Sequence, residues 1–168
     1  MFVTIPRFTM FTDSDGKYVY TSTEEQQLNS LTQTRQIRAL QGTVNTYSLN
    51  GVETITLNHL DADLRLYFID KQVAENGVFI SNVGQENWDK WSRVDNLESY
   101  PLNNLVYKFG VLPNSGTCYI QFPQDIANLI QGGLTIKYLS TSGGAGNVQA
   151  RTIDQFYQET DLALQGLE

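Results

Sequence analysis

The chain lacks most of the residues that mark small secreted proteins and nucleic-acid-binding proteins. Its single cysteine, Cys118, excludes an internal disulfide and therefore a disulfide-supported mini-domain. Lys and Arg number 11 against 18 Asp and Glu, which gives a net charge of −7, and no basic cluster occurs. Phosphate groups require concentrated positive charge. We therefore expect neither nucleic acid nor an anionic membrane as a partner.

Long apolar runs are also missing from the chain. No stretch approaches the roughly 20 apolar residues that span a bilayer, and the first residues do not have the pattern of a signal peptide. A strand-like pattern starts directly at Phe2, and Leu162–Glu168 reads as the start of a further element. We therefore expect the chain to be a fragment of a longer protein.

What is present favours β-structure. Hydrophobic residues make up 40% of the 168 residues and charged residues only 17%, as in a globular chain with one domain or two small ones. Nine Tyr, eight Phe and 13 Gly favour strands and turns over helix bundles.

Short alternating segments recur along the chain, separated by turn residues such as Asn50-Gly51. They predict strands at Phe2–Phe11, Lys17–Thr21, Thr34–Leu49, Glu53–Asn58, Leu64–Asp70, Gly77–Ser81, Trp88–Val94, Leu105–Val111 and Thr117–Phe122, with short helices at Pro123–Gly132 and Asp154–Gln165. The predicted fold is mainly β: β-sandwich-like, or α+β with many short antiparallel strands and one or two short helices. We expect a β-rich domain over 1–153, open to division into 1–60 and 61–153. Residues 154–168 are then a helical tail or the start of a missing region.

A glycine-rich loop interrupts the last alternating segment, Leu134–Ile153. Its structural positions are Gly143, Gly144, Gly146 and Asn147, since glycine allows positive φ and close backbone approach. A Walker A loop would continue as G-K-[ST], and a dinucleotide-binding loop would lead into a helix. Neither pattern follows, so we predict strand, tight packing loop and strand, without a phosphate site.

The residues that could support catalysis or metal binding form no coherent set. His59 is the only histidine, and it lacks both a framed serine and further zinc ligands. Cys118 fits a buried strand position. Asp61, Asp63 and Asp70 are candidate acid–base carboxylates, but solvated surface explains them equally well. We predict no catalytic residue, no metal site and no cofactor, and we do not expect an enzyme.

Aromatic side chains are the remaining candidates for binding. Trp88, Trp91 and Tyr100 are candidate interface aromatics. They fit a core equally well, and together with Tyr107 and Tyr119 they could form a sugar-stacking platform. The sequence leaves these three roles open.

Several motifs occur in an order that resembles a known family. They are I-P-R-F-T-M-F at Ile5–Phe11, Y-V-Y-T at Tyr18–Thr21, A-L-Q-G at Ala39–Gly42, W-S-R-V-D at Trp91–Asp95, Y-L-S-T-S-G-G-A-G-N-V at Tyr138–Val148 and A-R-T-I at Ala150–Ile153. In this order they resemble the phage baseplate J-like family, the wedge proteins of contractile tails and related injection systems. The chain departs from the family pattern at Arg7-Phe8, where a small pair is usual. At Ile120–Asp125 it is closer to the wedge proteins of large myophages.

The resemblance implies a virion structural protein, of phage or prophage origin, that is part of a baseplate wedge. Such a protein would be assembled in the host cytoplasm into the tail baseplate. It would act through homo- or hetero-oligomeric contacts with other baseplate and tail subunits, without an active site or cofactor. Two alternatives stay open: a carbohydrate-binding or adhesion β-sandwich of a tail or cell surface, and a hydrolase that uses acidic residues.

Overall fold

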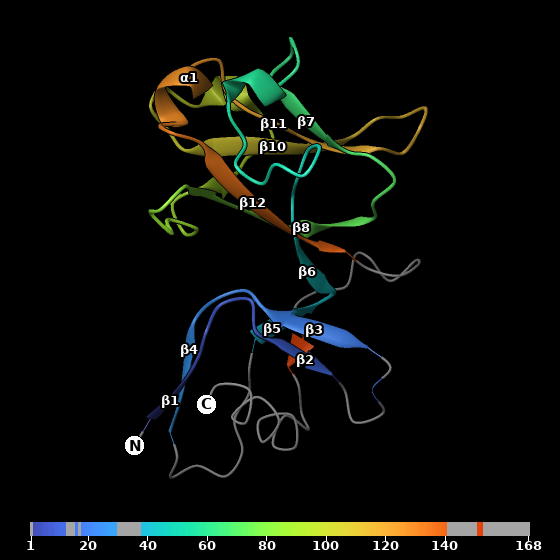
Figure 1. The fold of residues 1–168 in the computed structure, drawn as a ribbon, viewed down its shortest axis with the longest axis vertical. Coiled ribbons are helices and arrows are strands. Elements are labelled where there is room, and N and C mark those ends of the chain that lie inside the picture. The colour runs from blue at the N-terminus through green and yellow to red at the C-terminus, as the bar shows by residue number, and fades with distance from the viewer. Residues whose placement is uncertain (1, 13–15, 17, 30–37, 141–150, 153–168) are drawn as a thin grey trace. The chain divides into compact units, whose positions relative to one another are not determined.

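The computed structural model describes residues 2–12, 16, 18–29, 38–140 and 151–152 and is mainly β, which confirms the predicted fold class (Figure 1). The chain forms two compact units. Unit 1 comprises Met1–Val44 and Leu139–Glu168, and unit 2 comprises Asn45–Tyr138. This division differs from the expected boundary at residue 60. The difference arises because unit 1 takes segments from both ends of the chain.

Unit 1 contains an antiparallel sheet with the strand order β13-β5-β3-β2. Its strands are β2 (Met10–Thr12), β3 (Val19–Ser22), β5 (Arg38–Gln41) and β13 (Arg151–Thr152). A separate antiparallel ribbon pairs β1 (Phe2–Ile5) with β4 (Gln26–Asn29). Pro6 ends β1, as expected for a residue that cannot donate to a sheet. The expected strand at Phe2–Phe11 is therefore two strands in different pairings.

The strand expected at Thr34–Leu49 is divided at Gly42, and its first four residues lie outside the described ranges. Gly42 has φ 142°, and its N–H donates at 2.8 Å to the carbonyl of Val19, the residue opposite it in the register of β3 and β5. The hydroxyl of Thr21 donates to the Gly42 carbonyl at 2.8 Å. Gly42, with its positive φ, separates β5 from β6 (Thr43–Thr46).

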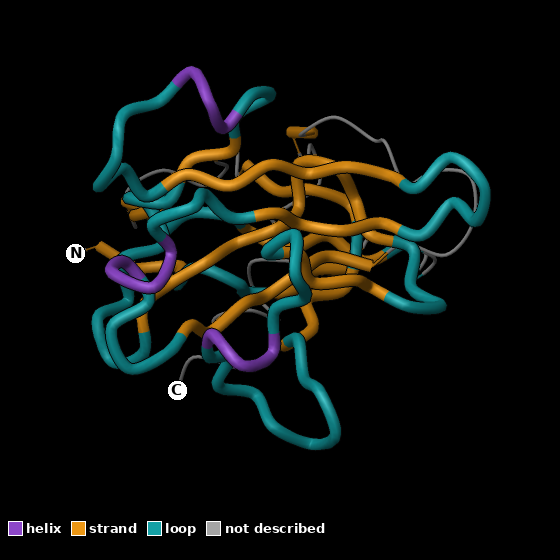
Figure 2. Tube along the Cα trace, turned by 90° about the horizontal axis from the view of Figure 1, so that it is seen from above, coloured by secondary structure: helices purple, strands orange, loops and turns teal. Residues whose placement is uncertain are grey.

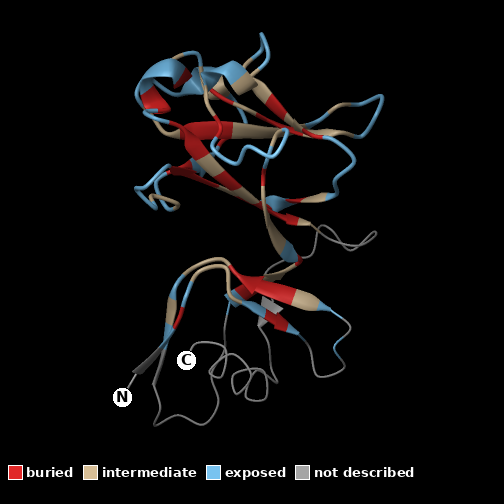
Figure 3. Cartoon of the chain, in the orientation of Figure 1, coloured by how far each residue is buried: buried red, intermediate tan, exposed pale blue. Residues whose placement is uncertain are grey.

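Unit 2 is built on two sheets that face a common core. One sheet has the order β7-β11-β10-β9, with strands β7 (Arg65–Phe68), β11 (Cys118–Gln121), β10 (Val106–Val111) and β9 (Ser92–Arg93). The other has the order β6-β12-β8, with β12 (Leu134–Ser140) and β8 (Val73–Asn82). Both contribute inward side chains to one buried cluster, including Leu66, Phe68, Ile120, Val78, Ile80, Leu134 and Ile136 (Figure 3). This arrangement is a sandwich.

Alternation was the correct signal for β12. Leu134, Ile136 and Tyr138 are buried in the core, while Thr135 and Lys137 are only half-buried, as the expected strand required. The second half of the expected segment contributes β13, whereas the glycine loop with Gly143, Gly144, Gly146 and Asn147 lies outside the described residues. The helix expected at Asp154–Gln165 lies outside them too.

The Asn50-Gly51 turn is also confirmed. Both residues have positive φ, 51° and 82°, as a two-residue hairpin turn of type I′ requires. Leu49 and Val52 exchange both backbone hydrogen bonds at 2.9 Å. The turn is local chemistry, so the sequence is sufficient to predict it.

The prediction of a strand at Glu53–Asn58 is wrong. Only Ile55 makes a bridge, to Leu134, and a 3₁₀ turn, η1 (Leu57–His59), follows. The imidazole Nδ1 of His59 accepts from the backbone N–H of Thr56 at 2.9 Å and stabilises this turn. A side-chain acceptor thereby replaces a strand partner.

Helical structure in the described residues is limited to single turns between strands (Figure 2). Besides η1, these are η2 (Leu97–Ser99) and α1 (Ile126–Leu129). The helix expected at Pro123–Gly132 is much shorter because positive φ values at Gln131, Gly132 and Gly133 end it. In the part of the chain that the structure describes, no helix is long and apolar enough to cross a membrane.

Candidate functional site

Four sequence motifs that lie far apart along the chain meet in one sheet of unit 1, which we call the motif sheet (β13-β5-β3-β2). In its register Met10 lies opposite Thr21, Tyr20 opposite Gln41, and Ala39 opposite Arg151. Residues 10–11, 19–21, 39–41 and 151–152 of these motifs thus lie in neighbouring strands. Their order along the sheet follows from hydrogen bonding and was not part of the sequence pattern.

The motif sheet is fixed by buried polar bonds as well as apolar contacts. Thr21 and Ser22 are fully buried. Besides the bond from Thr21 to Gly42, the hydroxyl of Ser22 donates to the Pro6 carbonyl at 2.9 Å, and the Ser22 N–H donates to the Thr9 carbonyl at 2.9 Å. Buried polar groups that are fully paired hold one arrangement of the backbone. All the residues in these bonds except Ser22 belong to the resembling motifs.

The candidate interface aromatics have different environments in unit 2. Trp91 is only 6% exposed, its indole N–H donates to Oδ1 of Asn82 at 3.2 Å, and its ring packs edge-on against Phe122. Its role is in the core of unit 2, which corrects its assignment as an interface aromatic. Trp88 is half-buried, whereas Tyr100 is 46% exposed. Of the three, Tyr100 presents the most surface.

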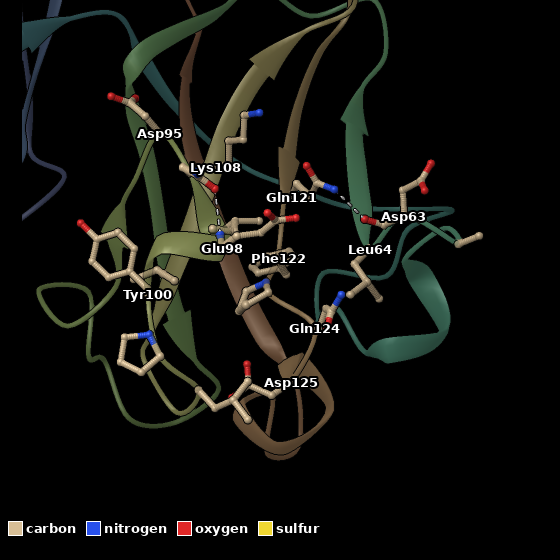
Figure 4. A pocket seen from close by; sticks show the side chains of 17 residues that line it. Asp63, Leu64, Asp95, Glu98, Tyr100, Lys108, Gln121, Phe122, Gln124 and Asp125 are labelled. Atoms are coloured by element: carbon tan, nitrogen blue, oxygen red, sulfur yellow. Dashed lines mark hydrogen bonds between the residues drawn. The ribbon is translucent and has the colours of Figure 1, made fainter.

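Tyr100 lies beside an open pocket of about 930 Å³ in unit 2 (Figure 4). Its lining comes from residues 62–64 before β7, residues 95–98 and 100–102 around η2, and residues 121–125 from the end of β11 onwards, with Val106 and Lys108 of β10. Figure 4 shows Glu98, Gln121 and Phe122 together near its middle, with Tyr100 towards one side and Asp63 towards the other. The pocket therefore depends on segments about 60 residues apart in the sequence.

The charged groups of this pocket are unbalanced. Its lining contains four carboxylates, Asp63, Asp95, Glu98 and Asp125, and one ammonium, Lys108. Asp125 accepts from the Asn103 N–H at 2.6 Å. Among the described residues, neither Lys108 nor the other three carboxylates takes part in an ion pair. The pocket is consequently electronegative and rich in free hydrogen-bond acceptors.

Asp61 lies next to the pocket and holds the turn that leads into β7. One carboxylate oxygen accepts from the backbone N–H groups of Asp63 and Arg65 at 2.9 and 3.0 Å, and the other accepts from the Tyr67 hydroxyl at 2.7 Å. Slight burial raises the pKa of Asp61, but these hydrogen bonds outweigh it and leave the pKa below its ordinary value. Asp61 therefore stays ionised and acts as a turn-forming acceptor.

The other candidate catalytic residues are not brought together. Asp70 follows the opposite end of β7 from Asp61 and Asp63. His59 uses its Nδ1 within η1, and Cys118 is a half-buried residue of β11 that packs against the core. Within the described ranges, no three His, Cys, Asp or Glu side chains are grouped as metal ligands.

Most of the pocket residues were not singled out from the sequence. Glu98, Lys108, Gln121 and Asp125 come from three different segments, and no spacing pattern connects them. Only the N-cap pattern at Asn96, whose side chain accepts from the Glu98 N–H at 2.9 Å, was a usable local signal.

The chain matches no family model, no curated protein and no solved structure in comparisons with known proteins.

Proposed function

We propose that this chain is a structural module of a contractile-tail baseplate wedge, and that it acts through assembly with other baseplate and tail subunits in the virion. The resemblance to the baseplate J-like family suggested this function. One structural observation carries it further, namely the pairing of four of the resembling motifs in the motif sheet. Motifs chosen for their order along the chain are thus also adjacent in space.

Adjacency matters because unrelated short matches have no reason to pair. Ala39 of one motif lies opposite Arg151 of another, more than a hundred residues away in the sequence. Two further strand pairings, of β5 with β3 and of β3 with β2, join the remaining motifs. A shared sheet is the expected result if the motifs are the remains of one ancestral domain.

Unit 1 also exposes apolar surface on the hairpin formed by β2 and β3. Met10 is 51% exposed on β2, the last strand of the described sheet, and Tyr18, the residue before β3, is 39% exposed. Exposed apolar side chains on an edge strand suit contact with another subunit. We assign this hairpin as one of the assembly contacts.

The direct test is peptide mass spectrometry on contractile particles purified from the organism that encodes the chain, after prophage induction. We expect its peptides to co-purify with sheath and tube proteins in a constant ratio. Recovery only in the cell-envelope or secreted fraction would refute the proposal.

The assembly contact has its own test in particles complemented with variants. Met10→Asp should lower incorporation, because a carboxylate would be buried at a subunit contact. Val111→Asp, at a position of unit 2 with the same exposure (52% against 51%), is the matched control. Equal incorporation of the two variants would remove the hairpin from the contact.

A further inference from the structure

The unit 2 pocket has no part in the proposed assembly function, yet it combines an exposed aromatic ring, free acceptors and a formed cavity. We propose that this pocket binds a short oligosaccharide that is neutral or carries amino groups, with Tyr100 as the surface on which a sugar ring stacks. The site adds a recognition function to a structural module.

The apolar part of the site comes from one segment. Tyr100 and Leu102 are 46% and 67% exposed, and Pro101 between them is exposed too. A pyranose ring has an apolar face of C–H groups, which packs on such surfaces. Tyr offers a large rigid face at low cost in side-chain entropy, together with a polar tip that remains solvated. This composition suits a sugar better than a purely apolar ligand.

The polar part of the site suits hydroxyl groups. Asp95 and Glu98 have acceptor oxygens without ion-pair partners among the described residues, and Gln124 is exposed at the pocket. Gln121 donates one N–H to the Asp63 carbonyl at 3.0 Å, and its amide has further donor and acceptor capacity. Sugar hydroxyls both donate and accept, so they can satisfy these groups together with the ammonium of Lys108.

The charge of the pocket restricts the class of sugar. The lining contains four carboxylates and a single ammonium, that of Lys108, and the whole chain has a net charge of −7. Uronic acids, sialic acids and sulfated or phosphorylated sugars would be repelled, because like charges at close distance disfavour binding. Neutral sugars avoid this repulsion, and the positively charged amino groups of amino sugars would be attracted by the carboxylates.

The walls of the pocket are already held in place. Phe122 donates its N–H to the Leu64 carbonyl at 2.9 Å, and Asn103 donates to Asp125 at 2.6 Å. Leu64 and Asn103 both have positive φ, 63° and 68°, conformations that persist only where surrounding contacts enforce them. A preformed cavity of about 930 Å³ keeps the ordering cost of binding low.

The test is a glycan array probed with the full chain, followed by titration calorimetry with the best-binding soluble oligosaccharide. We expect neutral or amino-bearing glycans to bind and acidic glycans to be absent among the ligands. Tyr100→Ala should weaken binding by about tenfold or more, because truncating a central aromatic side chain of a binding site commonly has an effect of this magnitude on affinity. Glu98→Gln should weaken binding of amino-bearing glycans more than binding of neutral ones.

Tyr18→Ala is the matched control, because it removes a similarly exposed tyrosine from unit 1 (39%). It should leave binding unchanged, and thermal melting of all three variants should stay close to that of the parent chain. Binding of acidic glycans, binding insensitive to Tyr100→Ala, or no binding to any glycan would overturn the proposal. If Tyr100→Ala instead prevents incorporation into particles without any glycan binding, the pocket is a subunit contact and the sugar site is refuted.

Discussion

Gly110 in β10 is a position where an added methyl group should be harmful for a specific geometric reason. Its φ is not in the left-handed region, so alanine fits the backbone. A Cβ atom there would lie 2.4 Å from both Cζ and Oη of Tyr119 on the neighbouring strand β11. Ordinary contact begins near 3.4 Å, so the ring must move by about 1 Å.

The ring of Tyr119 is not free to move without loss. It is 8% exposed, the guanidinium carbon of Arg65 lies 4.2 Å from its centroid, and the Tyr67 ring lies 6.1 Å away. Overpacking costs about 1–3 kcal/mol, and a weakened cation–π contact adds about 0.5–1 kcal/mol. Replacing glycine in a strand returns roughly 0.5–1 kcal/mol. We expect Gly110→Ala to lower the free energy of unfolding by about 1–3 kcal/mol.

Urea unfolding of a double-mutant cycle tests this reasoning. In a Tyr119→Leu background the clash is absent, so Gly110→Ala should be neutral or slightly stabilising. If Gly110→Ala destabilises both backgrounds equally, or neither, the ring of Tyr119 is not the cause and the argument fails.

Three further predictions follow from buried or hydrogen-bonded polar groups. Burial raises the pKa of Tyr107 to about 12. Between pH 10 and 12 the folded state therefore keeps a proton that the unfolded state loses, so the free energy of unfolding should fall over this range by about 3 kcal/mol for this group. Urea unfolding as a function of pH measures this fall, and Tyr107→Phe should make it smaller. The side chain of Asn82, which is 3% exposed, takes part in four hydrogen bonds, with the carbonyls of Leu129 and Ile130, the side-chain amide of Asn87 and the indole N–H of Trp91. Its substitution by alanine should cost about 2–4 kcal/mol, whereas Asn76→Ala at an exposed position should cost little; equal effects in urea unfolding would contradict the network. Tyr67→Phe should raise the pKa of Asp61 towards its ordinary value, since it removes one of the hydrogen bonds that lower it; an unchanged carboxyl titration by NMR would show that the other bonds suffice.

The sequence predicted local features well and long-range pairing poorly. The Asn50-Gly51 turn and the alternation of β12 depend on neighbouring residues, and both are confirmed. The prediction of a strand at Glu53–Asn58 was wrong because the Thr56 N–H donates to the imidazole of His59 and not to a neighbouring strand. Strand propensity does not take such side-chain acceptors into account. No local sequence pattern predicts that β13 pairs with β5. The expected boundary at residue 60 therefore differs from the division into two units in the structure.

The candidate site depended even more on tertiary structure. Trp91 and Tyr100 have similar aromatic character in the sequence, but one lies in the core and the other at the surface. Alternation could not separate them because β9 is only two residues long and η2 follows it closely. The pocket itself joins four segments, and its charge imbalance becomes visible only when they are brought together.

The chain reaches and leaves unit 2 on adjacent strands, since β6 and β12 are neighbours in one sheet and Tyr47 donates its N–H to the Ile136 carbonyl at 2.7 Å. An insertion whose two ends are adjacent can be exchanged for another without stretching its host. Along the chain, unit 2 is therefore an insertion between the two segments of unit 1, and it could be exchanged as a whole. The boundaries at Val44 and Leu139 are therefore the places at which a reporter or a new binding domain could be grafted in place of unit 2.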